Sequence, residues 1–131
     1  MNPKELLYAE THEWVRVAPE GGRKVATIGI TAFALEQLTD LVHMVLPKVG
    51  TQVKAGTPFG EVESVKAVSD LYSPVDGEVI ATHGDLANKL ETLGSDPYGE
   101  GWMIKVALSD ESSLKKLMDA AAYEKQCATE G

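Results

Sequence analysis

Two segments of this chain share one short pattern, and their positions constrain the fold more than any other feature. Residues 47–53 read P-x-x-G-x-x-V and residues 74–80 read P-x-x-G-x-x-I. Proline followed by glycine is typical of turns, and between the two copies lie two strand-like runs that meet at Val65-Lys66. Two similar β units with a hairpin between them predict a flattened, quasi-symmetric β-sandwich, with the hairpin tip at one edge.

The rest of the pattern predicts a mainly β fold with flanking helices. Apolar alternation and β-branched residues indicate extended runs, in chain order, over 14–17, 24–29, 41–46, 59–64, 67–72, 78–82 and 102–108. Gly21-Gly22 should turn the first two runs into a hairpin, and Thr31 should cap a short helix over 32–40. Residues 83–101 are punctuated by glycine and proline and should be mostly loop. A C-terminal helix is expected over about 110–125.

Composition supports one domain and excludes several classes of function. The 131 residues, 44% of them hydrophobic, suffice for one core, so residues 1–131 are interpreted as a single domain. A net charge of −8 argues against nucleic-acid binding, because phosphate neutralisation needs clustered Lys and Arg. No apolar run approaches the roughly 18 residues of a membrane span. The single Cys127 and a polar N-terminus without a signal-peptide pattern favour a cytoplasmic location, or the mitochondrial matrix for a mature eukaryotic form.

The predicted hairpin tip carries a lysine that an enzyme could reach. Lys66 lies between Val65 and Ala67, with acids nearby at Glu63 and Asp70. Neighbouring acids favour the charged ammonium, so Lys66 is a poor candidate for a catalytic Schiff-base lysine, which needs desolvation or a cationic neighbour. Position alone leaves two interpretations open: an ordinary solvated surface lysine, or a lysine that another enzyme acylates.

No other motif indicates catalysis or metal binding. His12, His43 and His83 are scattered, and no Cys/His cluster has zinc-like spacing. The segment 99–101, Gly-Glu-Gly, lacks the strand-then-helix context of a phosphate loop. We therefore predict that the chain is not an enzyme and holds no metal.

The hairpin tip resembles the attachment site of a known family of carriers. Residues 63–67, Glu-Ser-Val-Lys-Ala, followed by Ser69-Asp70, closely resemble the lipoylation motif of the H-protein family of the glycine cleavage system. The wider biotinyl and lipoyl carrier domains also place a lysine on a hairpin between two glycine-containing half-repeats. The resemblance implies a lipoyl-domain-like barrel-sandwich hybrid, with a lipoyl-bearing core over about 42–82. Biotin carriers usually have methionines around the lysine, so Val65 and Ala67 favour lipoyl attachment.

The resemblance spans nearly the whole chain, with its motifs in the family's order. The other matching segments are His12-Glu13-Trp14, 28–31, Leu46-Pro47 with Gly50, 73–78, 96–102 and Tyr123. The chain departs from the family pattern at several positions, among them Phe33 and His83, where a histidine and an asparagine are usual. Phe33 bears most on function, because the family's histidine lies near the parked lipoyl arm.

The resemblance implies a non-catalytic, monomeric shuttle with lipoic acid joined to Lys66 as an amide. A lipoate ligase or lipoyl transferase would attach the lipoic acid. A pyridoxal-phosphate glycine decarboxylase would load an aminomethyl group, and a tetrahydrofolate-dependent aminomethyltransferase would remove it. Dihydrolipoamide dehydrogenase would then reoxidise the dithiol. The carrier contributes effective concentration, because a tethered group reaches each active site without diffusing away.

The same resemblance implies roles for further residues. Those expected to be recognised around the lipoylated lysine are Glu63, Ser64, Val65 and Ala67. Glu13 and Asp70 match family positions that line the cleft where the arm can dock. Their carboxylates are hypothesised to pair with the ammonium of the loaded arm. The alternative is that both acids only solubilise the rim.

Three other functions stay open from the sequence. The main alternative keeps the lipoyl chemistry but changes the pathway, to an H-like carrier for lipoate relay or sulfur oxidation, which the departures at Phe33 and His83 allow. An enzyme that uses Lys66 directly is a second alternative. A binding protein that needs no lipoylation is the third.

Overall fold

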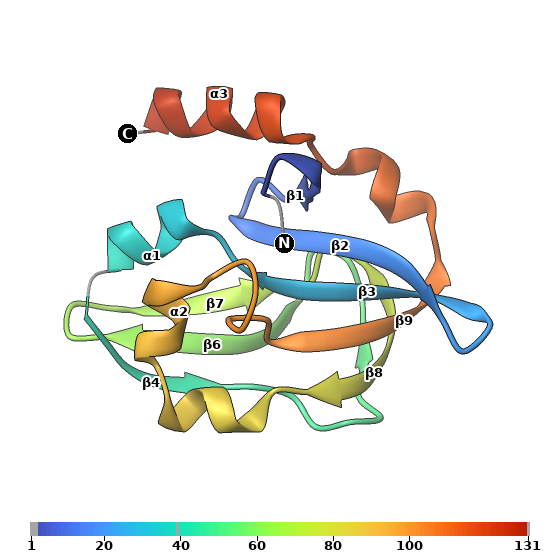
Figure 1. The fold of residues 1–131 in the computed structure, drawn as a ribbon, viewed down its shortest axis with the longest axis horizontal. Helices are drawn as coiled ribbons and strands as arrows, with labels where there is room; N and C mark the ends of the chain where they lie inside the picture. Colours follow the sequence, from blue (N-terminus) through green and yellow to red (C-terminus); the bar gives the residue numbers. More distant parts are fainter. Residues whose placement is uncertain (1–2, 39, 131) are drawn as a thin grey trace.

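The computed structural model describes residues 3–38 and 40–130, which form two β-sheets edged by short helices (Figure 1). The larger sheet has six strands in the order β1-β2-β3-β9-β8-β5, and the smaller has three in the order β4-β6-β7. All pairings within the sheets are antiparallel. The strands are β1 (Leu7–Tyr8), β2 (Glu13–Glu20), β3 (Arg23–Ile30), β4 (Leu41–Val45), β5 (Gln52–Val53), β6 (Pro58–Ser64), β7 (Val68–Tyr72), β8 (Asp76–Thr82) and β9 (Ile104–Asp110). The predicted mainly β, two-layered fold is confirmed, and the sheets do not close into a barrel.

Within residues 3–38 and 40–130, six short helical segments flank the sheets. Three are α-helices: α1 (Ala32–Leu38), α2 (Glu91–Ser95) and α3 (Ala120–Glu130). The others are 3-10 turns: η1 (Pro3–Glu5), η2 (Gly84–Asn88) and η3 (Ser112–Lys116). Figure 1 shows α3 lying over β1, and α1 beside the end of the molecule where β6 and β7 meet. Within the described residues, none of these helices has the length and apolar character needed to span a bilayer.

The N-terminal hairpin forms as its glycines predict. Strands β2 and β3 pair in continuous register from Glu13–Ile30 to Glu20–Arg23, and Gly21-Gly22 make the turn. Both glycines have left-handed φ angles, +61° and +82°, which glycine adopts without the steric cost of a Cβ. The hairpin matters for the site because it places the start of β2 beside the end of β3.

The two copies of the proline-glycine pattern lie side by side. The N–H of Gly50 donates to the carbonyl of Val79 (2.8 Å), and the N–H of Val79 donates to the carbonyl of Thr51 (2.9 Å). The two copies differ in the conformation of their glycines: Gly50 has a left-handed φ of +96°, whereas Gly77 lies within strand β8. A Cβ on Gly77 would lie 2.1 Å from the carbonyl oxygen of Ala107, so glycine is needed there for close strand packing.

One apolar core joins the two sheets. Its fully buried members include Ile28, Val62, Leu71 and Ile104, which come from both sheets. A second, smaller cluster lies under α3 and contains Leu6, Tyr8, Trp14 and Tyr123. The rings of Tyr8 and Tyr123 stack with centroids 4.5 Å apart. This cluster attaches α3 to the first strands and, through them, to the site described below.

The C-terminal helix predicted over about 110–125 is wrong in its bounds. The chain instead forms η3, then an extended pair of residues, then α3. The helix is interrupted because the N–H and carbonyl of Met118 both pair with Tyr8 of β1, at 2.7 and 2.8 Å. Asp119 then caps α3, since its Oδ1 accepts a hydrogen bond from the N–H of Ala122 (2.8 Å).

Two other expectations have mixed outcomes. The helix predicted after the hairpin is confirmed as α1, and Thr31 caps it, because its Oγ1 accepts a hydrogen bond from the N–H of Ala34 (3.3 Å). Thr39 falls inside the predicted range but lies outside the described residues. The segment 83–101 was expected to be mostly loop, yet it contains η2 and α2. Each of these short helices buries one leucine, Leu86 or Leu93, in the main core.

Candidate functional site

Lys66 lies exposed at the tip of the β6–β7 hairpin. Strand pairing ends with Glu63 opposite Val68, which leaves residues 64–67 to form a tight turn. The N–H of Ser64 donates to the carbonyl of Ala67 (2.8 Å) and closes that turn. The structure therefore places Lys66 at the edge of the molecule, as the half-repeats predict.

The buried side chain of Ser64 organises this turn from inside. Its Oγ accepts hydrogen bonds from the N–H groups of Lys66 and Ala67, each at 3.2 Å, and donates to the carbonyl of Ala67 at 3.3 Å. A further bond, from the N–H of Val65 to the carbonyl of Asp40 (3.1 Å), ties the tip to the segment before β4. The backbone that carries Lys66 is thus held in place, whereas its side chain extends into solvent.

The other predicted recognition residues divide into two kinds. Glu63, Val65 and Ala67 are exposed around Lys66, and Val65 is 66% exposed. Ser64 is only 4% exposed, so it contributes through the shape of the turn and not by presenting its hydroxyl.

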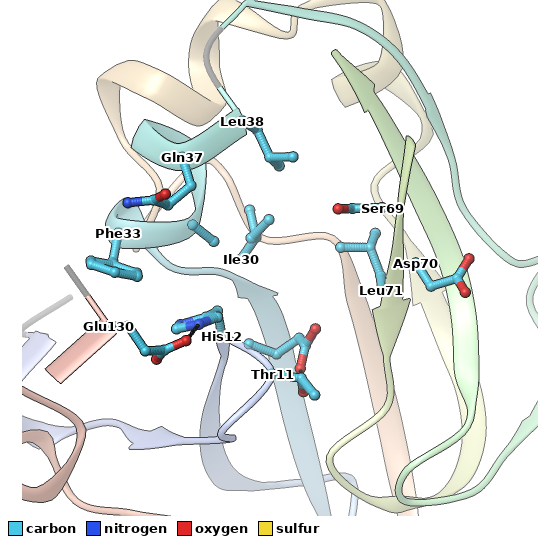
Figure 2. Close-up of a pocket in the computed structure, with 12 residues that line it drawn as sticks. Thr11, His12, Ile30, Phe33, Gln37, Leu38, Ser69, Asp70, Leu71 and Glu130 are labelled. Carbon is cyan, nitrogen blue, oxygen red and sulfur yellow. Dashed lines mark hydrogen bonds and ion pairs between the residues drawn. The ribbon is translucent and has the colours of Figure 1, made fainter. Parts of the chain in front are cut away.

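A cavity of about 280 Å³ lies along β7, the strand that leads away from Lys66 (Figure 2). Its walls come from the loop before β2, the end of β3, helix α1 and β7. One wall is apolar and includes Ile30, Leu38 and Leu71. The opposite end is polar and includes Thr11 and Glu13.

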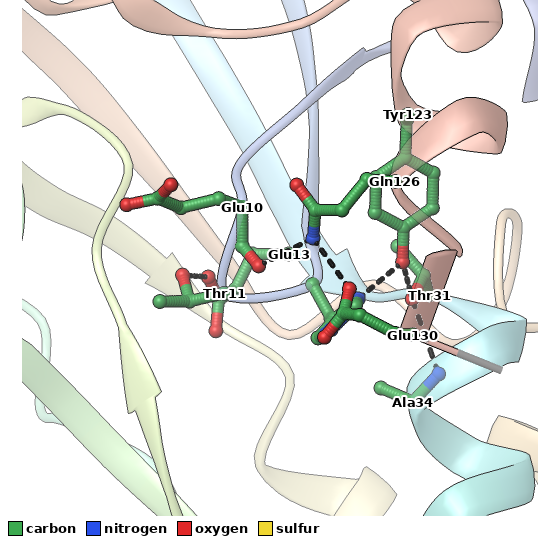
Figure 3. Close-up of polar contacts among 9 residues, drawn as sticks. Glu10, Thr11, Glu13, Thr31, Ala34, Tyr123, Gln126 and Glu130 are labelled. Atoms are coloured by element: carbon green, nitrogen blue, oxygen red, sulfur yellow. Dashed lines mark hydrogen bonds and ion pairs between the residues drawn. The ribbon is translucent and has the colours of Figure 1, made fainter. Parts of the chain in front are cut away.

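Glu13 is the buried acid of this cavity, with only 2% of its surface exposed. Its Oε2 accepts a hydrogen bond from the N–H of Tyr72 (3.2 Å), and its Oε1 accepts one from the hydroxyl of Thr11 (Figure 3). Burial raises the pKa of Glu13 from 4.5 to about 7, although these two hydrogen bonds act in the opposite direction. The cavity therefore contains a carboxyl group that gains or loses its proton near neutral pH.

Asp70 reaches the same cavity only from its edge. In Figure 2, Ser69 and Leu71 point from β7 towards the cavity, whereas Asp70 points to the other side of the strand. This follows from strand geometry, because successive side chains point to opposite faces. The structure thus brings Glu13 and Asp70 to one cavity, but it sets only Glu13 into the wall. Pairing of either acid with a loaded arm stays a prediction.

An aromatic wall joins the cavity to the C-terminal helix. The ring of Phe33 stacks on His12 with centroids 5.1 Å apart. Nδ1 of His12 lies 2.7 Å from the hydroxyl of Tyr123. That hydroxyl lies 2.6 Å from Oγ1 of Thr31 (Figure 3). His12 also has a φ of +76°, a left-handed conformation that is rare for a residue with a Cβ. These contacts hold a strained residue in the cavity wall, next to Glu13.

Residues at the C-terminal end of α3 contact His12 of this aromatic wall and the loop before β2. Oε1 of Glu130 lies 3.3 Å from Nε2 of His12, and Gln126 donates to the carbonyl of Glu10 and to Glu130 Oε2, both at 2.8 Å. From the sequence, His12 and Tyr123 have no predicted role beyond their place in family motifs. Their part in the site depends on contacts between residues more than 100 positions apart, which no local pattern reports.

Comparisons with known proteins point to one family. Residues 6–130 match the family model described as glycine cleavage H-protein. The chain is 59% identical to the glycine cleavage system H protein of Rhodopirellula baltica, over 99% of this chain and 98% of that one. It is 51% identical to the H protein of Marinobacter nauticus, over 98% and 96%. The crystal structure of the H protein from Mycobacterium marinum superposes with a TM-score of 0.83 at 36% identity, over 97% and 99% of the two chains.

Proposed function

The chain belongs to the glycine cleavage H-protein family, and on that premise we propose that Lys66 is the residue to which its lipoyl group is attached. Proteins of this family are lipoyl carriers of the glycine cleavage system, not enzymes, and hold lipoic acid covalently on a lysine. Their partners in that system are the decarboxylase and the aminomethyltransferase. The alternative of lipoate relay or sulfur oxidation is not favoured by these relatives.

The observation that carries the proposal is the position of Lys66 on a turn whose backbone is fixed. Ser64 and Asp40 hold the backbone of that turn through hydrogen bonds, while the amine projects from the molecule. An enzyme can therefore reach the amine without unfolding any element. After acylation, the attached arm starts from a defined point and either extends to a partner or folds back along β7.

The cavity along β7 fits such an arm in its chemistry. A bound lipoyl group supplies a disulfide that accepts the aminomethyl group on sulfur. The chain's own contribution is an apolar wall for the hydrocarbon, made by Ile30, Leu38 and Leu71, and a buried carboxyl at Glu13. An ammonium near Oε2 of Glu13 would favour the carboxylate form over the neutral acid, and the low local dielectric would strengthen that attraction. Glu13 would thereby hold a cationic cargo, with Asp70 as a second acid at the rim.

The finer assignments follow from what this chemistry requires. Formation of the amide at Lys66 needs a lipoate ligase or lipoyl transferase, and the spent dithiol needs an oxidising partner, for which we propose dihydrolipoamide dehydrogenase. We also propose a monomer, since the carrier must present one tip to several enzymes in turn. A cytoplasmic location, or the mitochondrial matrix in a eukaryote, agrees with the single cysteine.

Intact-mass measurement tests the attachment site directly. The wild type, Lys66→Arg and the control Lys54→Arg, which changes another exposed lysine, would be expressed with lipoate and a lipoate-attaching enzyme. One lipoyl increment is expected on the wild type and on Lys54→Arg, and none on Lys66→Arg. A lipoylated Lys66→Arg protein would refute the assignment. So would an unmodified wild type under conditions that lipoylate a control carrier.

A further inference from the structure

A second cavity, of about 500 Å³, lies at the end of the β6–β7 hairpin that is far from Lys66. Its walls come from residues 55–56 before β6, residues 72–74 after the turn-distant end of β7, the loop 9–11 and the segment 113–118. Small-molecule sites in proteins have volumes of about 300–1,000 Å³, so this cavity is large enough to be one. Thr11 lines both cavities, which makes them neighbours.

Two hydroxyl groups of the second cavity have unused hydrogen-bonding capacity. Ser113 is only 5% exposed, and its buried Oγ has no hydrogen-bond partner among the described residues. The hydroxyl of Tyr72 likewise lacks a partner within residues 3–38 and 40–130. Buried hydroxyls without partners are rare in native proteins, because each one costs free energy. Rotation about the Cα–Cβ bond of Ser113 would let its hydroxyl bond to a molecule held in the cavity.

Two opposite charges line the second cavity without pairing with each other. Glu10 and Lys116 are both exposed, and neither forms an ion pair within the part of the chain that the structure describes. The side chain of Gln126 holds the backbone of Glu10, because it donates to the Glu10 carbonyl (2.8 Å). Figure 3 shows the Glu10 carboxylate on the side away from Gln126 and α3. A ligand with one anionic and one cationic group would therefore find a partner for each.

The rest of the wall is apolar. It is made by the side chains of Ala9, Ala55, Pro74, Leu117 and Met118. A ligand with polar groups alone would leave this surface in contact with water, whereas an aliphatic group would cover it and gain the free energy of apolar burial. The second cavity thus favours a ligand that has both charges and a hydrocarbon part.

The same groups argue against other classes of ligand. A phosphate would find one cation, Lys116, and would be repelled by Glu10. A simple carboxylate would leave Glu10 unpaired, and a simple amine would leave Lys116 unpaired. The described residues contain no cluster of His, Cys, Asp and Glu suited to a metal ion. An α-amino acid meets every requirement, because it carries both charges on one carbon and leaves its side chain free for the apolar wall.

We propose that the second cavity binds a free α-amino acid with an aliphatic side chain. Lys116 pairs with the carboxylate of this ligand, and the hydroxyls of Ser113 and Tyr72 donate hydrogen bonds to it. Glu10 pairs with the ammonium group. The aliphatic side chain packs against Leu117 and its apolar neighbours. Binding is non-covalent and does not depend on a lipoyl arm, so the site is separate from the proposed attachment site.

The position of Thr11 gives this site a connection to the first cavity. Thr11 lines both cavities, and its hydroxyl donates to Oε1 of Glu13. An amino acid held by Glu10 would therefore restrict the loop that carries the hydrogen-bond donor of the buried carboxyl. The free amino acid pool would in this way act on the carrier beside the place where its cargo is held.

L-leucine and three analogues test the class of ligand. Glycine lacks the aliphatic side chain, 3-methylbutylamine lacks the carboxylate, and 4-methylpentanoate lacks the ammonium group. Each is titrated into the full, ¹⁵N-labelled chain at constant pH and ionic strength, and amide shifts are followed by NMR. Leucine should shift the amides of Ala9, Gly56 and Ser113 saturably, with a Kd of about 1 mM. Each analogue should bind about 5-fold more weakly or worse, because it leaves one part of the site unsatisfied.

Two outcomes of the titrations would overturn the proposal. The first is the absence of saturable shifts at these amides up to about 50 mM leucine, which would show a cavity that holds only water. The second is equally strong binding of either singly charged analogue, which would show that the two charges of the cavity do not act together. Shifts confined to the Lys66 hairpin or the first cavity would count as the first outcome.

Charge variants test which residues hold leucine. Lys116→Gln and Glu10→Gln should each weaken binding about 3- to 10-fold, because exposed ion pairs contribute modestly. The controls are Lys115→Gln, next to the site but outside its lining, and Glu78→Gln on β8. Both controls should bind leucine as the wild type does. Unchanged binding in both cavity variants would overturn the site, since leucine would then bind elsewhere.

Ser113→Ala separates a role in binding from a role in folding. The Ser113 hydroxyl has no partner in the folded chain, so its removal should leave stability in urea unfolding unchanged or slightly higher. Leucine binding should nevertheless weaken about 3- to 10-fold, because the carboxylate loses a donor. Full leucine affinity in Ser113→Ala would refute the part assigned to this hydroxyl. If this variant does not fold, Lys116→Gln and Glu10→Gln decide the proposal, since both change exposed side chains.

Discussion

Replacement of Glu13 by glutamine should remove a pH dependence that the buried carboxyl imposes on the stability of the fold. Glu13 has a pKa of about 7 in the folded chain, against 4.5 for the ordinary side chain. Between these values the folded state binds more protons at this site than the unfolded state does. Stability must therefore fall as pH rises from about 4.5 to about 7, and it should change little at this site above pH 7.

The magnitude follows from the size of the shift. One pKa unit corresponds to about 1.4 kcal/mol, so the shift from 4.5 to about 7 corresponds to about 3 kcal/mol. Solvent screening does not reduce this free energy, because only 2% of the Glu13 side chain is exposed. A domain of this size is stable by only about 5–15 kcal/mol, so the effect is large enough to measure. Glutamine has nearly the same shape and can still accept the hydrogen bond from the N–H of Tyr72, but it does not titrate.

The assay is urea unfolding of the wild type and Glu13→Gln at several pH values from 4.5 to 8. The stability of the wild type minus that of Glu13→Gln should fall by about 3 kcal/mol across this range, because all other titrating groups are common to both proteins. Glu78→Gln, at an exposed position on β8, should show no such trend. A difference between the wild type and Glu13→Gln that stays within about 0.5 kcal/mol over the whole range would refute the inference that burial dominates at this carboxyl.

Two further predictions concern the tip and the aromatic wall. Ser64→Ala should cost about 1–2 kcal/mol of stability and speed hydrogen exchange at the amide of Lys66, because that N–H loses its acceptor; unchanged exchange would show that Ser64 does not hold the turn. Tyr123→Phe should cost about 1–2 kcal/mol, because the polar atoms of His12 and Thr31 lose their shared partner. Urea unfolding measures the loss, and Tyr72→Phe is the control, since its hydroxyl has no hydrogen-bond partner among the described residues. An equal loss in both would contradict a specific role for the Tyr123 hydroxyl.

The parts of the fold that the sequence predicts are those that depend on neighbouring residues. Gly21-Gly22 determines the β2–β3 turn through backbone conformation alone, and the strand runs around Lys66 meet at a turn that residues 64–67 close by themselves. The break before α3 depends instead on Met118 pairing with Tyr8, a contact across the chain. A helical pattern in the sequence carries no information about such a competing strand. The same applies to α2, which forms where Leu93 reaches the main core.

The burial of Glu13 is another feature that local sequence patterns do not predict, because it depends on contacts between distant segments. Glu13, Trp14 and Val15 are all buried, although a strand with one solvated face would alternate. Both faces of β2 are covered at its start, because the main core takes Val15 and the cluster under α3 takes Trp14. An acid at this position cannot turn to water, so its pKa rises and its oxygens need donors from Thr11 and Tyr72. The motif that contains Glu13 marks the position, but only the packing of distant segments makes its carboxyl titrate near neutral pH.

Alternation along β7 then determines what each acid can do. Glu13 is buried in the cavity wall, whereas Asp70 lines the same cavity only at its rim and points to the other side of β7. A cation held in the cavity meets a buried carboxyl at Glu13, where attraction is strong because water is excluded. A cation at the exposed carboxyl of Asp70 would be attracted more weakly, and added salt would screen that attraction. Replacement of Glu13 should therefore weaken retention of a cationic cargo in the cavity more than replacement of Asp70 does, and only the contribution of Asp70 should fall clearly with added salt.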